Sequence, residues 1–411
     1  MEIGFAFSGG GPTALMCTLC YQAALDGLGL APVNATVVAV SGGALGYTVY
    51  QNVPAPLSYP PLLDDSGFAL EKEALSYPLS DAGTWMGQLF RYLPSLSDAQ
   101  MEEARCGSSW WAGALSVGLE LAYGVDMCAL EAGPRPYSIG ASLVHASALP
   151  LNLNSDGVFG EDPSGILAPV SVDMASHEAW VPDTAGTGLT PSGPIEALDA
   201  VAMSSAYWAD GIVEGAKSRA KNRALISVPT SGTRTVYGMD GGFVEMNGVA
   251  DLLRRRTANV VAFYQSSEKF DGDDVAWAYL FGTSEVNPST INSLEGPAVA
   301  ALFDSALWPA FRANMTAGAP VVLRDLSVRA NPYFGVAAYT LDTLLVMPNA
   351  ANAAFLDSFA DPDVAAALDA RWPDQFPVGI PTLDANVLCL FCGWKVRQVA
   401  GLLREILGVA G

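Results

Sequence analysis

Residues 3–11 read IGFAFSGGG and residues 37–44 read VVAVSGGA, and these two stretches decide the fold class. Each is a short apolar run, typical of a buried strand, that breaks into glycine and then into helix-forming sequence. Repetition of strand, glycine turn and helix favours a parallel sheet covered by helices. A third stretch, TVYGMDGG at residues 235–242, predicts a strand that ends at Asp240. We therefore predict the α/β class, with a mostly parallel central sheet covered by helices and with loop-rich insertions.

The rest of the chain indicates one α/β domain over residues 1–411, because no convincing linker or internal repeat interrupts it. Residues 150–195 are rich in Asn, Asp, Gly, Pro and Ser, which predicts loops with short strands and a cap or lid. Periodicity predicts further strands at 137–144, 222–228, 233–239 and 259–265, a helix at 198–217 and an amphipathic helix at 394–407.

The charge balance excludes some classes of partner. The chain carries 42 acidic and 20 basic residues, for a net charge of −22. Nucleic acid is not an expected partner, because phosphate backbones need basic patches. We see no apolar stretch long enough to span a bilayer and no basic-then-apolar secretory signal at the start, so we expect no transmembrane segment and a cytoplasmic location.

The cysteines allow three interpretations. Two C-x-x-C motifs, one at residues 17–20 and one at 389–392, lie in apolar runs, and two further cysteines stand at 106 and 128. Buried thiols pack as small hydrophobic groups, which is the interpretation we favour and which suits a reducing compartment. A disulfide and a metal site are the alternatives.

Ser41 occupies the position of a nucleophile between a strand end and a helix start. Such a turn needs small residues two before and two after the serine; Gly43 meets this need, and Ala39 stands where glycine is usual. The triple glycine at residues 9–11 suits an oxyanion hole at a helix N-terminus. It also fits the dinucleotide pattern G-x-G-x-x-A, but the second strand ends without the acidic residue that this pattern requires.

Asp240 is the candidate base. It follows a predicted strand and precedes two glycines, at the sheet edge where α/β sites gather, although Asp-Gly is also a common turn pair. The two histidines, His145 and His177, lie in no motif that marks a catalytic base. A serine–aspartate dyad needs no histidine, whereas a Ser-His-Asp triad would have to use one of these two.

Taken together, these motifs resemble the patatin-like and cytosolic phospholipase A2–lysophospholipase B superfamily of serine lipid acyl hydrolases. That group pairs a glycine-rich strand turn with a G-x-S-x-G elbow and a D-G-G/A aspartate, which are similar to residues 8–11, 39–43 and 240–242. Residues 203–209, MSSAYWA, look like the Ser-Ser-Ala helix of the phospholipase branch, and residues 240–263 look like the segment after its aspartate. The resemblance covers residues 1–50 and 198–268.

The resemblance implies Ser41 as the nucleophile, Asp240 as the general base, and the N–H groups of Gly10, Gly11 and Gly42 as the oxyanion hole. The reaction would be hydrolysis of a fatty-acid carboxylic ester through an acyl-enzyme, with no cofactor and no metal. The substrate would be a lipid ester, met during transient contact with a membrane or lipid-droplet surface.

Two departures from the family pattern bear on activity and substrate. The phospholipase branch usually has arginine two residues after the third glycine; this chain has Pro12 and then Thr13, which favours a neutral lipid or glycolipid ester over a phospholipid. Ala39 in place of glycine keeps open the alternative of a catalytically silent member that binds lipid or a protein. The acidic run DGDD at residues 271–274 is expected to be a solvated turn, with weak calcium binding as the other interpretation.

Overall fold

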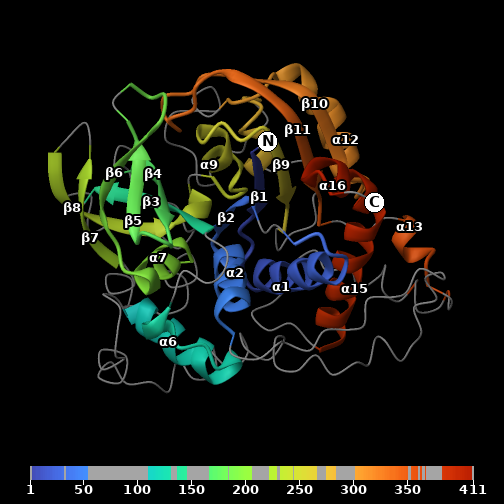
Figure 1. Ribbon diagram of the computed structural model, residues 1–411, viewed down its shortest axis with the longest axis horizontal. Coiled ribbons are helices and arrows are strands. Elements are labelled where there is room, and N and C mark those ends of the chain that lie inside the picture. Colours follow the sequence, from blue (N-terminus) through green and yellow to red (C-terminus); the bar gives the residue numbers. More distant parts are fainter. Residues whose placement is uncertain are drawn as a thin grey trace.

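The computed structural model describes residues 2–31, 34–53, 110–130, 137–145, 166–183, 185–205, 222–228, 232–243, 245–265, 275–283, 301–349, 353–359 and 382–409, together with 362 and 366. Within these ranges eleven strands form one sheet, in the order β10-β11-β9-β1-β2-β3-β4-β5-β6, with β8 pairing with β3 and β7 pairing with β8 (Figure 1). The strands are β1 (Ile3–Phe7), β2 (Thr36–Val40), β3 (Tyr137–His145), β4 (Ile166–Asp173), β5 (Glu178–Pro182), β6 (Leu189–Pro194), β7 (Asn222–Val228), β8 (Gly232–Asp240), β9 (Asn259–Phe263), β10 (Val321–Val328) and β11 (Tyr339–Met347).

The centre of the sheet is parallel. The strands β11, β9, β1, β2 and β3 all pair in the parallel sense, and antiparallel strands extend this core at both ends. The predicted α/β class with a parallel core is confirmed. Alternate residues of the central strands face opposite sides, so Phe5 and Phe7 enter one core while Ala6 enters the other. Burial on both faces explains why these strands read as continuous apolar runs.

Helices cover both faces of this sheet. On one face α1 packs against α2 and α15, and on the other α9 packs over β1, β2 and β9 (Figure 1). None of the helices in the described ranges is long and apolar enough to cross a membrane. The helices are α1 (Gly11–Gly27), α2 (Gly42–Asn52), α6 (Trp110–Tyr123), α7 (Ala197–Ser204), α9 (Val249–Arg254), α10 (Val275–Ala278), α12 (Trp308–Thr316), α13 (Ala353–Leu356), α15 (Thr382–Gln398) and α16 (Ala400–Leu407), with short 3-10 turns at Met127–Ala129, Gly241–Phe243 and Ser305–Leu307.

Most predicted elements appear close to their expected bounds. The helix predicted at 394–407 is two helices, because Val399 has φ −107 and ψ 8, away from helical values, and separates α15 from α16. The helix predicted at 198–217 is present as α7, and its later part lies outside the described residues. In the region predicted to form a cap, residues 166–194 make β4, β5 and β6 of the main sheet, and the cap stays a prediction.

The cysteines follow two of the three interpretations. Cys17 and Cys392 are buried free thiols, as packing predicts. The expectation of free thiols is wrong for Cys20 and Cys389, which form a disulfide between α1 and α15. Their Cα atoms lie 4.9 Å apart, within the usual range for a disulfide. Cys128 is also disulfide-bonded.

Candidate active site

Ser41 lies at a strained turn between β2 and α2. The strand ends at Val40, the helix begins at Gly42, and Ser41 between them has φ 51 and ψ −123. A positive φ is uncommon for residues other than glycine and costs free energy, and such strain clusters at functional sites. The local structure is therefore that of the predicted nucleophile turn.

Glycine allows this turn to pack against the triple-glycine loop. A Cβ atom on Gly42 would overlap the carbonyl oxygen of Gly11, and one on Gly43 would lie 2.5 Å from the carbonyl oxygen of Ser8. The two glycine-rich segments thus meet backbone to backbone. Ala39, the departure from the usual glycine, is fully buried within β2 and packs in the core.

Asp240 ends β8 and faces the serine. The hydroxyl of Ser41 donates a hydrogen bond to Oδ2 of Asp240 at 2.8 Å. The other carboxylate oxygen, Oδ1, accepts the backbone N–H of Gly242 at 2.7 Å, which fixes the orientation of the carboxylate. Asp240 is 2% exposed and Ser41 is 7% exposed, so the contact is shielded from solvent.

The pairing of β3 with both β2 and β8 explains why Ser41 and Asp240, 199 positions apart in the sequence, lie next to one another. The first half of β3 pairs with β2 in parallel, and its second half pairs with β8 in the antiparallel sense. On this edge β2 and β8 approach one another end to end. Gly241 follows Asp240 in the gap, where a Cβ atom would overlap the carbonyl oxygen of Gly140 and lie 2.7 Å from Val40 Cγ1.

Ser204 holds the serine turn from the side. Its hydroxyl accepts the backbone N–H of Ser41 at 2.7 Å and donates to the carbonyl oxygen of Gly140 at 2.6 Å. Ser204 is fully buried at the end of α7. The Ser-Ser-Ala stretch drew attention to this segment from the sequence, but the contact with Ser41 was not predicted, because no spacing rule relates residues 163 positions apart.

The triple-glycine loop lies beside the dyad. Gly10 and Gly11 have φ of 140 and 58, and α1 begins at Gly11. The backbone N–H of Gly9 donates to the carbonyl oxygen of Met246 at 2.8 Å, which joins this loop to the segment after Asp240. The N–H groups of a first helical turn have no partner within their helix, and Gly42 stands at the same position in α2. Their role as oxyanion donors stays a prediction.

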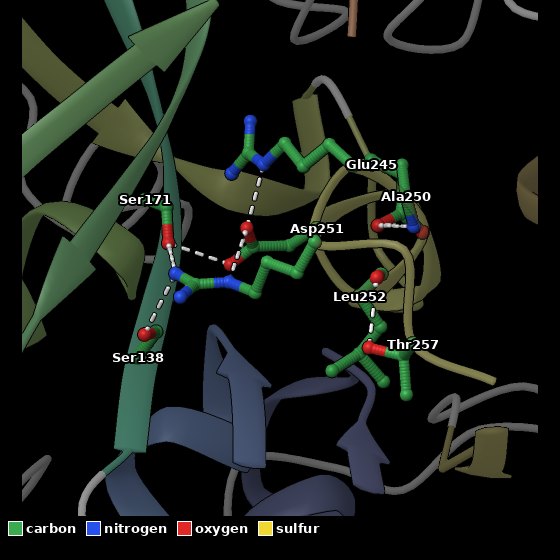
Figure 2. A network of polar contacts seen from close by, with 9 residues as sticks. Ser138, Ser171, Glu245, Ala250, Asp251, Leu252 and Thr257 are labelled. Atoms are coloured by element: carbon green, nitrogen blue, oxygen red, sulfur yellow. Dashed lines mark hydrogen bonds and ion pairs between the residues drawn. The ribbon is translucent and has the colours of Figure 1, made fainter. Parts of the chain in front are cut away.

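A second polar cluster lies beneath α9, on the face of the sheet opposite to α1 and α2 (Figure 2). Asp251 binds Arg254 Nε at 2.6 Å, Arg255 Nε at 3.3 Å and the hydroxyl of Ser171 at 2.6 Å. Arg255 also donates to the hydroxyls of Ser138 and Ser171, each at 3.0 Å. Burial raises the pKa of Asp251, but the two guanidinium groups outweigh it and lower that pKa to about 2. This cluster ties α9 to β3 and β4.

Glu245 shapes the segment between Asp240 and α9. Its two carboxylate oxygens accept the N–H groups of Asn247 and Ala250 at 2.8 and 3.1 Å. Burial raises the pKa of Glu245 to about 7, although these hydrogen bonds lower it. A cavity of about 20 Å³, room for roughly one water molecule, lies between this carboxyl, Val40, Gly140 and Gly241. Its lining includes neighbours of the dyad but neither member of it.

Other sequence candidates lie away from the dyad. His177 lies in the turn between β4 and β5. The carboxylate of Asp240 accepts the Ser41 hydroxyl directly, with no imidazole between them. Within the described ranges no group of three or more His, Cys, Asp or Glu side chains is arranged to hold a metal ion. The acidic run at 271–274 lies outside the described residues.

Comparisons with known proteins return structural similarity alone. No protein-family model and no curated protein matches the chain. The solved structure of human GIVD cytosolic phospholipase A2 is 14% identical, with a TM-score of 0.47, over 99% of this chain and 60% of that one. The same human protein in complex with methyl gamma-linolenyl fluorophosphonate and terbium chloride is 16% identical, with a TM-score of 0.43, over 100% and 60%.

The likeness therefore runs across the whole of this chain at low sequence identity, and it is to the group of proteins that the sequence motifs resemble. The chain spans about 60% of the length of the solved chains that it matches.

Proposed function

We propose that the protein is a serine acyl hydrolase that cleaves carboxylic esters of fatty acids. One observation carries the proposal: the hydroxyl of Ser41, on a strained strand-to-helix turn, donates directly to the buried carboxylate of Asp240 at 2.8 Å. A serine hydroxyl needs an adjacent base to become a nucleophile, and this carboxylate is already oriented by Gly242. The neighbouring glycine loop supplies the setting for oxyanion stabilisation.

The reaction follows from these positions. As Oγ of Ser41 attacks the ester carbonyl carbon, its proton passes to Oδ2 of Asp240. The oxyanion that forms is bound by the N–H groups of Gly10, Gly11 and Gly42. Collapse of this intermediate breaks the ester bond, and the leaving alcohol takes the proton from Asp240. Water then gives a proton to Asp240 and attacks the acyl-enzyme, and the fatty acid is released as Ser41 recovers its proton.

The substrate class rests on the motif resemblance and on the residues at the start of α1. The family position for a phosphate-binding arginine holds Thr13, which is fully buried and uncharged. The chain is also strongly acidic, with a net charge of −22. A neutral acylglycerol or glycolipid ester is the substrate we propose, met at the surface of a membrane or lipid droplet.

A second candidate is a catalytically silent protein that binds lipid or a protein partner through the same fold. The observation that favours it is the burial of the dyad, since Ser41 is 7% exposed and Asp240 2% exposed. An ester must reach Ser41 Oγ for hydrolysis, whereas a binding protein has no such requirement.

An alkyl fluorophosphonate probe separates the two candidates, because it forms a covalent bond only with an activated serine. We expect the wild-type chain to be labelled at Ser41 and the Ser41→Ala variant to remain unlabelled. Labelled protein is then digested, and the modified peptide is identified by mass spectrometry. A folded wild-type chain that takes up no probe between pH 5 and pH 9 would support the silent protein.

A panel of esters tests the substrate class. Vesicles or micelles of phosphatidylcholine, galactolipid and diacylglycerol are compared by the release of free fatty acid, with Ser41→Ala as the blank. We expect faster release from galactolipid or diacylglycerol than from phosphatidylcholine, and no loss of activity in a chelator. Faster hydrolysis of phosphatidylcholine would contradict the headgroup proposal while leaving the acyl hydrolase proposal intact.

A further inference from the structure

The two C-x-x-C motifs meet at the contact between α1 and α15. Cys20 and Cys389 form a bridge there that joins positions 369 residues apart. Residues three apart on a helix share a face, so Cys17 lies on the same side of α1 as Cys20, and Cys392 on the same side of α15 as Cys389. All four cysteines belong to one buried core cluster.

The two remaining thiols are neighbours. Cys17 and Cys392 are free and fully buried. Burial, and after it the adjacent Cys17, raises the pKa of the Cys392 thiol well above its usual value. The second pair of sulfurs therefore spans the same two helices as the existing bridge, about one helical turn away.

A buried amine completes the cluster. Lys395 lies three residues beyond Cys392, is fully buried, and its Nζ makes no hydrogen bond within the described part of the chain. Its Nζ stands 4.1 Å from the centre of the Phe391 ring. Burial lowers the pKa of Lys395 to about 7, although Cys392 and Cys17 raise it. Burying a lysine amine without hydrogen bonds costs folding free energy. We therefore look for a chemical function of this amine beside the two thiols.

We propose that Cys17 and Cys392 are a redox-active pair that closes to a second disulfide beside Cys20–Cys389, with the Lys395 amine accepting the thiol proton. The oxidant is a peroxide, small enough to enter a packed core. The Cys392 sulfur attacks one peroxide oxygen while its proton passes to Lys395, so that no free thiolate forms in the apolar core, and the O–O bond breaks to give a sulfenic acid and, after proton return, water. The Cys17 sulfur then attacks the sulfenic sulfur and expels a second water. Two thiols and one hydrogen peroxide become one disulfide and two waters.

The modification would act on an element next to the dyad. The helix α1 begins at Gly11, in the triple-glycine loop. A second disulfide would join α1 to α15 at two positions and so limit movement of α1 relative to α15. The proposal does not depend on the proposed hydrolase activity, since the cluster and its chemistry stand on α1 and α15 alone.

The test measures the thiols of the 411-residue chain directly. Native protein is treated with hydrogen peroxide, quenched in acid, denatured, alkylated with N-ethylmaleimide and digested without reduction. Before oxidation, the cross-linked α1–α15 peptide is expected to carry two maleimide groups, at Cys17 and Cys392. After oxidation the same peptide is expected to carry none, with a mass lower by two hydrogens than that of the unalkylated dithiol.

Three variants separate the proposed chemistry of the cluster from its packing. Lys395→Met keeps a long apolar stem in the core and removes the amine, and it is expected to slow closure of the pair at least tenfold at pH 8. Thr18→Ser, on the same helix outside the cluster, is expected to leave the rate unchanged. Loss of one thiol in Cys392→Ala is expected to leave one maleimide, on Cys17, whatever the peroxide exposure.

Three results would overturn the proposal. The first is two maleimide groups on the peptide after prolonged peroxide treatment of native protein. The second is a stable sulfinic acid at either cysteine in place of the bridge. The third is a native mass that includes a bound zinc ion and four free thiols in this peptide after denaturation, which would make the cluster a metal site.

Discussion

Val40 and Asp240 pair with consecutive residues of β3: Val40 lies opposite Gly140, and Asp240 lies opposite Ala141. Two strands from distant parts of the chain thus use one edge of β3, and they approach from opposite ends. The residue after Val40 is Ser41, which brings its hydroxyl to the Asp240 carboxylate. The geometry of the dyad is therefore set by backbone register, which is more rigid than side-chain packing alone.

Asp240→Asn is expected to reduce the rate of ester hydrolysis by about 10²–10⁴-fold, the range that a general base contributes. The amide is nearly isosteric with the carboxylate, so the fold is preserved while the proton acceptor is lost. The measurement is kcat on a soluble fatty-acid ester, together with the rate of fluorophosphonate labelling. Unfolding midpoints of the variant and the wild type should agree closely, and retention of more than a tenth of the wild-type rate would argue against Asp240 as the base.

Ser204→Ala is expected to slow labelling of Ser41 roughly tenfold. The change removes the acceptor of the Ser41 N–H and the donor to the Gly140 carbonyl, and each unpaired buried group costs about 1–3 kcal/mol. Since this serine orients the turn and does not touch the ester, kcat should fall more than KM rises. Labelling kinetics and a full kcat and KM measurement check this.

Ser205→Ala is the matched control for that experiment. Ser205 accepts the indole N–H of Trp111 at 3.1 Å and donates to the carbonyl oxygen of Val201, so both hydrogen bonds of its hydroxyl lie away from the backbone of Ser41. We expect it to lower stability while leaving the labelling rate at Ser41 unchanged. Equal losses of labelling in the two variants would show that Ser204 acts only through overall stability.

Four of the five strands of the parallel core, β1, β2, β3 and β9, could be predicted from the sequence, and of these β1 and β2 are buried apolar runs followed by serine and glycine. Ser41 and Asp240 could be selected for the same reason: both stand where such a run ends. Their proximity could not be derived from the residues alone, because it depends on β8 pairing with the second half of β3 in the antiparallel sense.

Contacts between residues far apart in the sequence could not be predicted either. The disulfide between Cys20 and Cys389 joins two helices whose sequence patterns indicate only apolar packing. The spacing within each C-x-x-C motif does not predict which cysteine of the other motif it will pair with. The polar cluster around Asp251 was not predicted either. It depends on serines of β3 and β4 that face α9, and isolated serines in a strand carry no distinctive signal.

Gly42→Ala is expected to abolish labelling of Ser41 and to lower stability by several kcal/mol, because the added methyl overlaps the Gly11 carbonyl oxygen and separates the two glycine-rich segments. The control is Gly401→Ala in α16, where a Cβ atom meets nothing within 4 Å. That change should stabilise the protein by about 0.5–1 kcal/mol through helix propensity. Labelling and thermal unfolding are measured for both, and an active Gly42→Ala enzyme would refute the close packing of the turn.

Asp251→Asn is expected to destabilise the protein by about 3–5 kcal/mol at pH 7, because it leaves the buried Arg254 and its neighbour Arg255 without their anionic partner. The pKa of Asp251 is lowered from 3.8 to about 2, so its ionisation contributes about 2 kcal/mol of stability above pH 4. That contribution is lost as the pH falls through about 2, since the folded carboxylate is then protonated. The gap in unfolding free energy between wild type and variant should therefore narrow between pH 4 and pH 2.

Denaturant unfolding at pH 7, 4 and 2.5 measures this gap. Glu405→Gln is the matched control, because the ion pair of Glu405 with Arg324 is 3.0 Å long but more than half exposed on both sides. An exposed pair contributes less than about 1 kcal/mol, so this variant should stay close to wild type at pH 7. A gap for Asp251→Asn that stays constant from pH 7 to pH 2.5 would mean that shape, and not charge, is what Asp251 contributes beneath α9.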